Sequence, residues 1–464
     1  MRRSEWLPTL DDRPGPKYLR IVDALAEDIY AGRIATGQRL PTHRDLAWKL
    51  KVTVGTVSRA YAEAERRGLL TGEVGRGSFV RAGARSQQTL AMPDQAPAMA
   101  VELGINRPPA ALAAPYFAAA LQDLADPETL TGLMNYQAHT GRWDHRVAGS
   151  HFITRRGYEV SPDRVLVTSG AEHAIAASLM AFCEPGDEIL VEQYTWSGVR
   201  ALASLLRLKL TPIAMDAFGA MPEALEAACR SSVPRMFYTI PTIQNPTSLT
   251  MPADRRRRIA DVASQYGLVL VEDDIYGFLD PLAIPPLASF APDRTVYITA
   301  TSKLLAPSLR VGYAALPEDR LGRFAAAARA SNWMAPPVMA DVARRWIIDG
   351  TAQTLMGKVS AEARRRGQIA RSVLDGHRFQ LADHGFHLWL DLPEPWRALD
   401  LVKAAKDRGV ALTPTDLFVP GRQETPHCVR LCLTAPESEQ ALRRGLMVIA
   451  DLLVQEPEPL LAIV

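Results

Sequence analysis

Cysteine is scarce in this sequence. The 464 residues include only four cysteines, Cys183, Cys229, Cys428 and Cys432, and none forms a Cys-x-x-Cys pair. This spacing supports neither a disulfide framework nor a zinc site, so no bound metal is expected. Long apolar runs are also missing, and the first residues lack the apolar core of a signal peptide. The chain is therefore expected to act in the cytoplasm, without a membrane partner.

The length and the charge distribution suggest more than one domain. A chain of 464 residues is too long for one ordinary core. Residues 1–85 carry 16 basic and 10 acidic side chains, a net charge of +6, whereas the whole chain has a net charge of +2. A basic N-terminal module on a mildly acidic body favours an anionic partner for that module. A solvated basic surface would give the same count.

The sequence of the N-terminal module, residues 10–82, predicts three helical segments and a hairpin. Apolar residues recur at helical spacing between residues 18 and 30, and Gly32 ends that helix. Thr42 and Thr53 are good N-caps for two short helices joined by a tight turn, which together make a helix-turn-helix. Residues 69–71 and 77–80 predict two strands around a turn, the form of a β-wing.

This pattern resembles the winged helix-turn-helix of the GntR family of bacterial regulators, through residues 37–47, 52–57, 60–61 and 75–80. The resemblance implies a double-stranded DNA operator, with a helix in the major groove and the wing in the adjacent minor groove. Val54 stands where the family often has an arginine, so the operator sequence is not predictable. A dimerisation module without DNA is the alternative. The expected DNA-binding residues are Arg44, Thr53, Gly55, Thr56, Arg59, Arg76 and Gly77.

Residues 83–100 have the composition of a linker, and residues 101–464 form the body. In the body, strand-like apolar runs alternate with helical patterns. This alternation predicts an α/β domain with a mostly parallel sheet, whose functional groups gather beyond the carboxyl ends of the strands. The strands are expected at residues 165–167, 188–191, 236–238, 268–271 and 296–298.

A lysine in a small, hydroxyl-rich loop, Lys303, follows the last of these strands, and Arg310 lies seven residues further on. A lysine amine can condense with an aldehyde, and hydroxyl groups with an arginine can hold a phosphate. Pyridoxal 5'-phosphate (PLP) offers both groups in one molecule. A loop lysine in water is the alternative, and the lysine stands out only because matching residues lie elsewhere in the chain.

The other strands are also followed by polar or aromatic residues. A helix that begins after Gly170 could cradle a phosphate, Trp196 could stack on a ring, and Asn245 could donate to a phenolic oxygen. Asp273 could bind a pyridine nitrogen, and Arg430, in a late strand, is a natural partner for a carboxylate. Each string alone is also compatible with an ordinary turn, a core aromatic or a structural ion pair.

Together these strings resemble the fold-type I PLP-dependent aminotransferases over most of residues 100–440. The resemblance implies a mostly parallel sheet with helices on both faces and a small C-terminal α/β subdomain. It also implies a role for each residue: Lys303 as the Schiff-base lysine, Asp273 on the pyridine nitrogen, Asn245 and Tyr276 on the phenolic oxygen, Ser169, Gly170, Ala171, Ser302 and Arg310 on the phosphate, Trp196 stacked on the ring, Arg430 on a substrate carboxylate, and Tyr136 reaching the phosphate of the other subunit.

Four positions depart from that family's pattern. Glu172 stands where glutamine is common, and Trp196 stands where tyrosine is usual. Ala300 and Thr301 replace a hydroxyl residue and an aromatic residue. The added negative charge and the lost hydroxyl would weaken phosphate binding without removing an essential group.

A GntR-type winged helix joined to such a body resembles the MocR subfamily of bacterial regulators. The resemblance implies a PLP-dependent transcriptional regulator that binds DNA, senses PLP and a small amino acid or amine, and forms a head-to-tail homodimer. An active aminotransferase with an appended DNA-binding domain is the alternative, because the residues for half-transamination are present. A DNA-binding scaffold without PLP would not explain why Lys303, Asp273, Asn245 and Arg430 coexist. The effector, the operator and the direction of regulation stay open.

Two runs of arginine, residues 255–258 and 364–366, are predicted to lie on solvated helix faces, with DNA contact as a lesser alternative.

Overall fold

The protein is described by a computed structural model that covers residues 6–8, 16–30, 33–34, 37–66, 69–73, 77–80, 101–420 and 425–455. Contacts divide the chain into two compact units, Met1–Ala96 and Pro97–Val464. The predicted linker, residues 83–100, lies outside the described residues.

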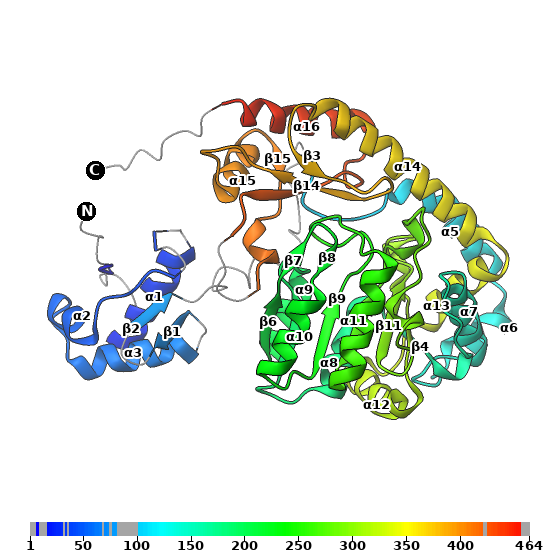
Figure 1. Ribbon diagram of the computed structural model, residues 1–464, viewed down its shortest axis with the longest axis horizontal. Coiled ribbons are helices and arrows are strands. Elements are labelled where there is room, and N and C mark those ends of the chain that lie inside the picture. Colours follow the sequence, from blue (N-terminus) through cyan, green and yellow to red (C-terminus); the bar gives the residue numbers. More distant parts are fainter. Residues whose placement is uncertain are drawn as a thin grey trace. The chain divides into compact units, whose positions relative to one another are not determined.

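The N-terminal unit is a winged helix-turn-helix (Figure 1). Thr42 accepts a hydrogen bond from the Asp45 N–H at 3.2 Å, and Thr53 accepts one from the Thr56 N–H at 3.2 Å. Both predicted caps therefore form, and apolar side chains of the three helices share one core. The elements are α1 (Lys17–Tyr30), α2 (His43–Lys49), α3 (Val54–Arg66), β1 (Leu70–Glu73) and β2 (Gly77–Val80).

The large unit is built on a seven-stranded sheet in the order β4-β12-β11-β10-β9-β5-β6. β12 is antiparallel to both of its neighbours, and the other neighbouring strands are parallel. The six strands other than β12 therefore run in the same direction, and their carboxyl ends lie at the same edge of the sheet. Their bounds, with that of β12, are β4 (Val165–Thr168), β5 (Glu188–Glu192), β6 (Lys209–Ile213), β9 (Met236–Thr239), β10 (Val269–Asp273), β11 (Thr295–Ala300) and β12 (Gly312–Ala315).

Helices cover both faces of this sheet (Figure 1), because successive strand residues point to opposite faces. Val271 packs on one face with side chains of α8, α9 and α12, and Leu270 packs on the other with α10 and α11. Tyr297 continues the second face beneath α7 and α13. The helix bounds are α7 (Trp143–Thr154), α8 (Ala171–Phe182), α9 (Ser197–Leu205), α10 (Pro222–Ser231), α11 (Ala253–Tyr266), α12 (Leu321–Asn332) and α13 (Pro337–Ile348).

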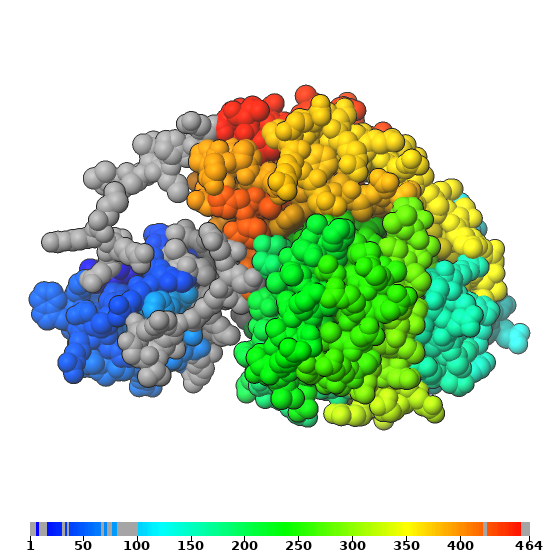
Figure 2. Space-filling view, viewed as in Figure 1, coloured from blue at the N-terminus to red at the C-terminus, as the bar shows by residue number. Residues whose placement is uncertain are grey.

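A smaller C-terminal subdomain adjoins the sheet. Figure 2 shows it, coloured orange to red, lying directly against the green sheet domain. Its antiparallel sheet joins β13 (Phe379–Gln380), β14 (His387–Asp391) and β16 (Cys428–Cys432). β3 (Val101–Glu102) pairs with β15 (Val410–Ala411), so the start of the large unit lies beside its late part (Figure 1). The remaining elements are α5 (Ala110–Asp123), α6 (Pro127–Met134), α14 (Thr351–Val373), α15 (Ala398–Asp407), α16 (Glu439–Leu453), β7 (Met215–Asp216) and β8 (Gly219–Ala220).

The predicted fold class is confirmed, but the prediction of two solvated arginine runs is partly wrong. Arg256 is fully buried and donates to three backbone carbonyls and to Thr242. Arg366 is also buried and binds Glu362 at 2.7 Å. One residue in each run turns inward because a helix rotates about 100° per residue and a run of three or four spans both faces.

No helix in the described part of the chain combines the length and the apolar character that crossing a bilayer requires.

Replacing Arg256 with methionine is expected to lower the free energy of unfolding by about 3–5 kcal/mol, because it leaves the buried Glu272 carboxylate, 4.0 Å away, without its cationic neighbour. Arg258→Met is the matched control, since Arg258 lies on the exposed face of the same helix. Urea unfolding measures both. Equal losses in the two variants would contradict a structural role specific to Arg256.

Candidate functional site

The carboxyl edge of the sheet gathers most of the predicted site residues. Asp273 is the last residue of β10, and Lys303 follows the end of β11. Gly170 follows β4, and Asn245 lies in the loop after β9. The C-terminal subdomain adds Arg430 from β16. Hydrogen bonds link these segments to one another and to their neighbours.

Lys303 lies largely buried, and its Nζ donates to the backbone carbonyl of Asn106. Burial lowers the pKa of the Lys303 amine to about 8. Its hydrogen-bond acceptor is an uncharged carbonyl, and the charges of Arg430 and Arg310 also disfavour the ammonium form, so the Asp273 carboxylate offsets only part of the cost of burial. A neutral amine is therefore readily available, which is the form that attacks an aldehyde.

Asp273 is buried at the end of β10, and burial raises the pKa of its carboxyl to about 6. Tyr238, on the neighbouring strand β9, donates its hydroxyl to Asp273 Oδ2 at 2.8 Å. Asp273 Oδ1 has no hydrogen-bond partner. One oxygen is thus fixed by the protein, and the other is available for a ligand with a proton to share.

Arg430 joins the small subdomain to the edge of the sheet. It donates to Asn245 Oδ1 at 2.8 Å and to the backbone carbonyl of Gly104, and its guanidinium lies 4.6 Å from the Phe418 ring centroid. Since arginine only donates, the Asn245 atom that faces it is the oxygen, and Nδ2 points elsewhere. Arg430 Nε is buried without a partner, so the guanidinium keeps a free donor for an anion.

The start of α8 and the Arg310 side chain form a compact cradle. Gly170 caps α8 with a φ of 87°, and a Cβ at this position would lie 3.1 Å from Arg310 Nη2. Arg310 donates to the Ser169 carbonyl at 3.2 Å, and the Ser169 N–H donates to His173 at 3.1 Å. Ser302 Oγ is buried without a partner. Ala171 is the first residue of the helix, where free N–H groups favour phosphate.

Three other predicted cofactor residues have different surroundings. Tyr276 is fully buried, and its hydroxyl has no partner. Trp196 is half-buried beyond β5, where a Cβ at Gly198 would lie 2.1 Å from its ring. Tyr136 is 83% exposed and pairs with Trp333 at a centroid distance of 5.8 Å. Tyr136 therefore lies on the surface of its own chain, and its predicted role at the phosphate of another subunit stays a prediction.

Sequence reasoning missed the segment of residues 104–106 and its neighbour His387. The carbonyls of Gly104 and Asn106 accept from Arg430 and Lys303, and Asn106 Nδ2 lies 2.9 Å from His387 Nδ1. No sequence pattern indicates them, because the segment contributes backbone carbonyls and follows the two-residue strand β3, which is too short to predict.

Most of the predicted DNA-binding residues are exposed on the N-terminal unit. Arg44, Thr53 and Gly55 are exposed at the starts of α2 and α3, and Thr56 is half-buried. Arg59 is exposed, with its guanidinium 4.1 Å from the Tyr18 ring centroid. Gly77 begins β2 with a φ of 111°, and a Cβ there would lie 3.0 Å from the Arg39 Nε. Arg76 lies outside the described residues.

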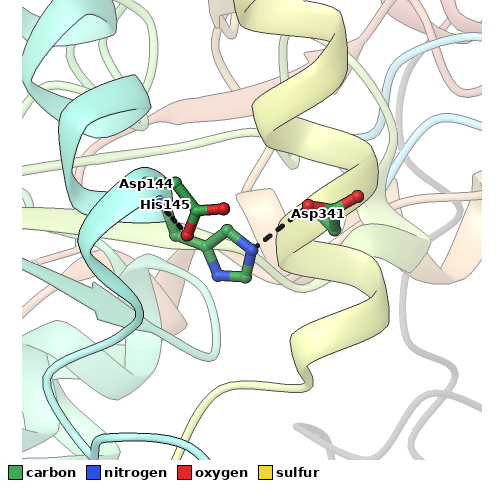
Figure 3. Close-up of side chains that lie close together, drawn as sticks. All are labelled: Asp144, His145 and Asp341. Carbon is green, nitrogen blue, oxygen red and sulfur yellow. Dashed lines mark hydrogen bonds and ion pairs between the residues drawn. The ribbon is translucent and has the colours of Figure 1, made fainter. Parts of the chain in front are cut away.

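Asp144 and His145 of α7 lie next to Asp341 of α13 (Figure 3). His145 Nε2 is 3.5 Å from Asp341 Oδ1. Arginines already bind both carboxylates: Arg142 binds Asp144 at 3.0 Å, and Arg344 and Arg345 bind Asp341 at 2.7 and 2.8 Å. Because cationic side chains surround the carboxylates, this cluster is an ion-pair network between two helices, and a metal ion would have to displace them.

Comparison with known proteins identifies both units. A family described as aminotransferase class I and II matches residues 98–449, and the gntR family of bacterial regulatory proteins matches residues 17–80. The chain therefore belongs to the aminotransferase class I and II family and carries a GntR-family domain. The predicted combination of a GntR-type winged helix and a fold-type I body, as in MocR-type regulators, is confirmed.

Individual relatives agree with this assignment. The chain is 32% identical over 449 residues to the HTH-type transcriptional regulator YdeF of Bacillus subtilis (strain 168), covering 97% of this chain and 96% of that protein. It is 27% identical to the HTH-type transcriptional regulator YdcR of Escherichia coli (strain K12), covering 87% and 92%. An archaeal alanine:glyoxylate aminotransferase has a similar structure, with a TM-score of 0.72 at 21% identity over 85% of this chain and 99% of that one.

The cofactor of this family is PLP, and the residues present fit it. Buried polar atoms without partners occur on four predicted site residues: Asp273 Oδ1, Tyr276 Oη, Ser302 Oγ and Arg430 Nε. A ring nitrogen, a phenolic oxygen, a phosphate and a substrate carboxylate would satisfy them in turn. The close approach of Gly170 to Arg310 leaves no room for a side chain where the phosphate would bind.

If Lys303 captures PLP, as predicted, the rate of capture by the PLP-free protein is expected to rise with pH and to level off above about 8, because only a neutral amine attacks an aldehyde and burial lowers the pKa of Lys303 to about 8. Below that pH the neutral fraction falls about tenfold per unit. Stopped-flow absorbance over pH 6–10 measures the rate.

Lys303→Ala is the control for this measurement. After borohydride reduction, peptide mass spectrometry should find the phosphopyridoxyl group on Lys303 of the wild type and on no residue of the variant. Equal labelling of the variant would show that another lysine captures the cofactor.

Proposed function

We propose that this protein is a transcriptional regulator that binds operator DNA through its winged helix and responds to a small amino compound through its PLP-binding body. The observation that carries the proposal is the joining of a complete helix-turn-helix to a body that retains Lys303, Asp273 and Arg430. A DNA-binding protein also acts where the chromosome lies, which supports the expected cytoplasmic location.

Each residue of the site has a task toward PLP. When bound, PLP supplies an aldehyde that combines with amines and a ring that withdraws electrons. Lys303 Nζ would hold the aldehyde carbon, and Asp273 Oδ1 would keep the ring nitrogen protonated. Asn245 Nδ2 and Tyr276 Oη would bind the phenolic oxygen. Trp196 would cover the ring. The phosphate would bind Arg310, Ser302 and the backbone of Ser169, Gly170 and Ala171.

Arg430 favours an effector that carries a carboxylate. Its guanidinium is held in a fixed orientation by Asn245 Oδ1 and the Gly104 carbonyl. Both acceptors are uncharged, so they do not neutralise the positive charge that would attract a carboxylate. An amino acid would place its carboxylate on Arg430 and present its amine toward Lys303. Its arrival would change the contacts of both residues, and the difference between the two states could bias DNA binding.

The proposed assembly is a head-to-tail homodimer. Tyr136, Met134, Trp143 and Trp333 are large apolar side chains that remain about half exposed or more in the single chain. They occur in two chain segments, residues 134–143 and 333, that touch through Tyr136 and Trp333. A second subunit would cover them and carry Tyr136 to its phosphate site. The predicted linker, residues 83–100, would let each winged helix reach DNA.

Aminotransferase activity is the second candidate. The lowered pKa of Lys303 favours it, because a lysine that is neutral near pH 8 can act as a base as well as a nucleophile.

Arg44→Ala is expected to weaken operator binding roughly 5- to 150-fold if Arg44 reads a base edge, a loss of about 1–3 kcal/mol. Operators are first selected by the full-length protein from a random-sequence library, and binding is then measured at several salt concentrations. Lys17→Ala, at the start of α1 outside the helix-turn-helix, is the control and should bind as wild type. Unchanged binding by the Arg44 variant would remove that residue from the DNA interface.

Titration of the PLP-loaded protein with amino acids and amines separates the regulator from the enzyme. For a regulator, one compound shifts the absorbance band and no product forms after a 2-oxo acid is added. Continuous cycling with a 2-oxo acid would instead make the protein an enzyme first. No spectral response to any amino compound would contradict both candidates.

A further inference from the structure

The side chain of Asn106 presents a buried acceptor that the protein itself leaves unused. Asn106 is 9% exposed, and its Oδ1 has no hydrogen-bond partner. Buried side-chain carbonyls in folded proteins nearly always have a donor, so an exception in a ligand site calls for an explanation. Its neighbour His387 supplies the first part of that explanation.

The tautomer of His387 follows from its two contacts. Nε2 lies 3.0 Å from the Gln244 carbonyl, which can only accept, so Nε2 carries the hydrogen. Burial lowers the pKa of His387 to about 3, so the ring is neutral and Nδ1 is a bare acceptor. The ring therefore cannot donate through Nδ1.

The orientation of the Asn106 amide follows in turn. The amide atom 2.9 Å from His387 Nδ1 must be the donor Nδ2, because an oxygen there would face a lone pair. Oδ1 is then directed away from His387. A rotation of the amide that gave Oδ1 another partner would break the hydrogen bond between Nδ2 and His387.

The segment that carries Asn106 contacts both residues that would meet an effector. The Asn106 backbone carbonyl accepts from Lys303 Nζ, and the carbonyl two residues earlier, at Gly104, accepts from Arg430. The unpaired Oδ1 therefore belongs to the residue that binds the lysine that would capture an amine, two residues from the one that binds the arginine that would hold a carboxylate.

We propose that Asn106 Oδ1 binds the N–H of an incoming primary amine, the amino group of an α-amino acid whose carboxylate rests on Arg430. This inference rests on the proposed function and adds a specificity residue to it. A 2-oxo acid of the same shape carries no donor at this position and would leave Oδ1 unpaired. The contact thus favours amino acids over their oxo counterparts.

The place of Asn106 in the chain is also relevant to regulation. Asn106 lies four residues after the end of β3, and β3 begins directly after the predicted linker. The Glu102 carboxylate accepts from the Gly104 and Ile105 N–H groups, which ties this short segment into one turn. A hydrogen bond from an amino acid to Asn106 would therefore act on the segment through which the body joins the linker.

The test compares wild type with Asn106→Leu, which matches the side chain in size and lacks Oδ1, and with Asn106→Ala, which serves if leucine prevents folding. The PLP-loaded, full-length proteins are titrated with each of the twenty L-amino acids, followed by absorbance. The 2-oxo acid of the tightest binder is then measured by competition. Thr413→Val is the control, since Thr413 Oγ1 donates to the Gly104 carbonyl at 2.8 Å and holds the same segment.

We expect both Asn106 variants to bind the amino acid roughly 10- to 100-fold more weakly, the range for loss of a hydrogen bond to a charged donor. Their affinities for PLP and for the 2-oxo acid should stay within about twofold of wild type, so the preference for the amino form disappears. Thr413→Val should change both affinities in equal proportion or not at all.

Wild-type affinity for the amino acid in both Asn106 variants would overturn the proposal. Equal losses for the amino acid and the 2-oxo acid would also overturn it, because they would indicate a merely structural role. If the PLP-loaded wild type responds to no amino acid, the proposed function fails first, and the contact fails with it. A response of the wild type that both variants retain would instead overturn the Asn106 contact alone.

Discussion

Positive charge gathered at the ends of the strands is the constraint on which the site depends. Arg430 is buried and Lys303 is largely buried, each next to a backbone carbonyl, whereas Arg310, beside Ser169, is exposed. The pKa of the Asp273 carboxyl is raised to about 6 by burial, so this group only partly offsets the charge of Lys303. Burying cations that are only partly offset is costly, and a ligand with a phosphate and a carboxylate would reduce that cost. The site therefore favours a ligand with two anionic groups at fixed positions.

A polar network beneath the site holds the two halves of the large unit together. The Gln244 side chain donates to the Glu192 carboxylate at 3.0 Å and to the Tyr194 carbonyl, and it accepts from Thr247. The backbone carbonyl of Gln244 accepts from Nε2 of His387 in the small subdomain. The loop after β9 is therefore fixed from both sides, and it carries Asn245 at its centre. A change in the position of the subdomain would move Arg430 and Asn245 together.

Much of this arrangement could be predicted from the sequence, and the rest depends on contacts that leave no local pattern. The strand ends near Gly170, Asp273 and Lys303 could be predicted, because apolar strands and the polar residues after them are adjacent in the chain. The caps at Thr42 and Thr53 are equally local. The role of Asn106 could not be predicted, because its partners lie 197 and 281 residues away.

The buried arginines mark a second limit of sequence reasoning. Arg256 stands in a run of four arginines that looks uniformly solvated, yet it is the one that faces the carbonyls of Pro241 and Pro285. Helical phase alone cannot choose between neighbours in a uniform run. Only the packing of α11 against the sheet decides which one turns inward.

The pairing of β3 with β15 sets an order of events during synthesis. Residues 17–80 contain the whole winged helix, which can fold as soon as it leaves the ribosome. The strand that follows must wait for Val410, more than three hundred residues later, before it has a partner. Until β15 and β16 are made, β3 has no partner strand and the Gly104 carbonyl has no Arg430 to bind, so the segment that carries Asn106 is not held in place. A nascent or truncated chain would therefore carry a finished DNA-binding unit long before it could respond to a small molecule.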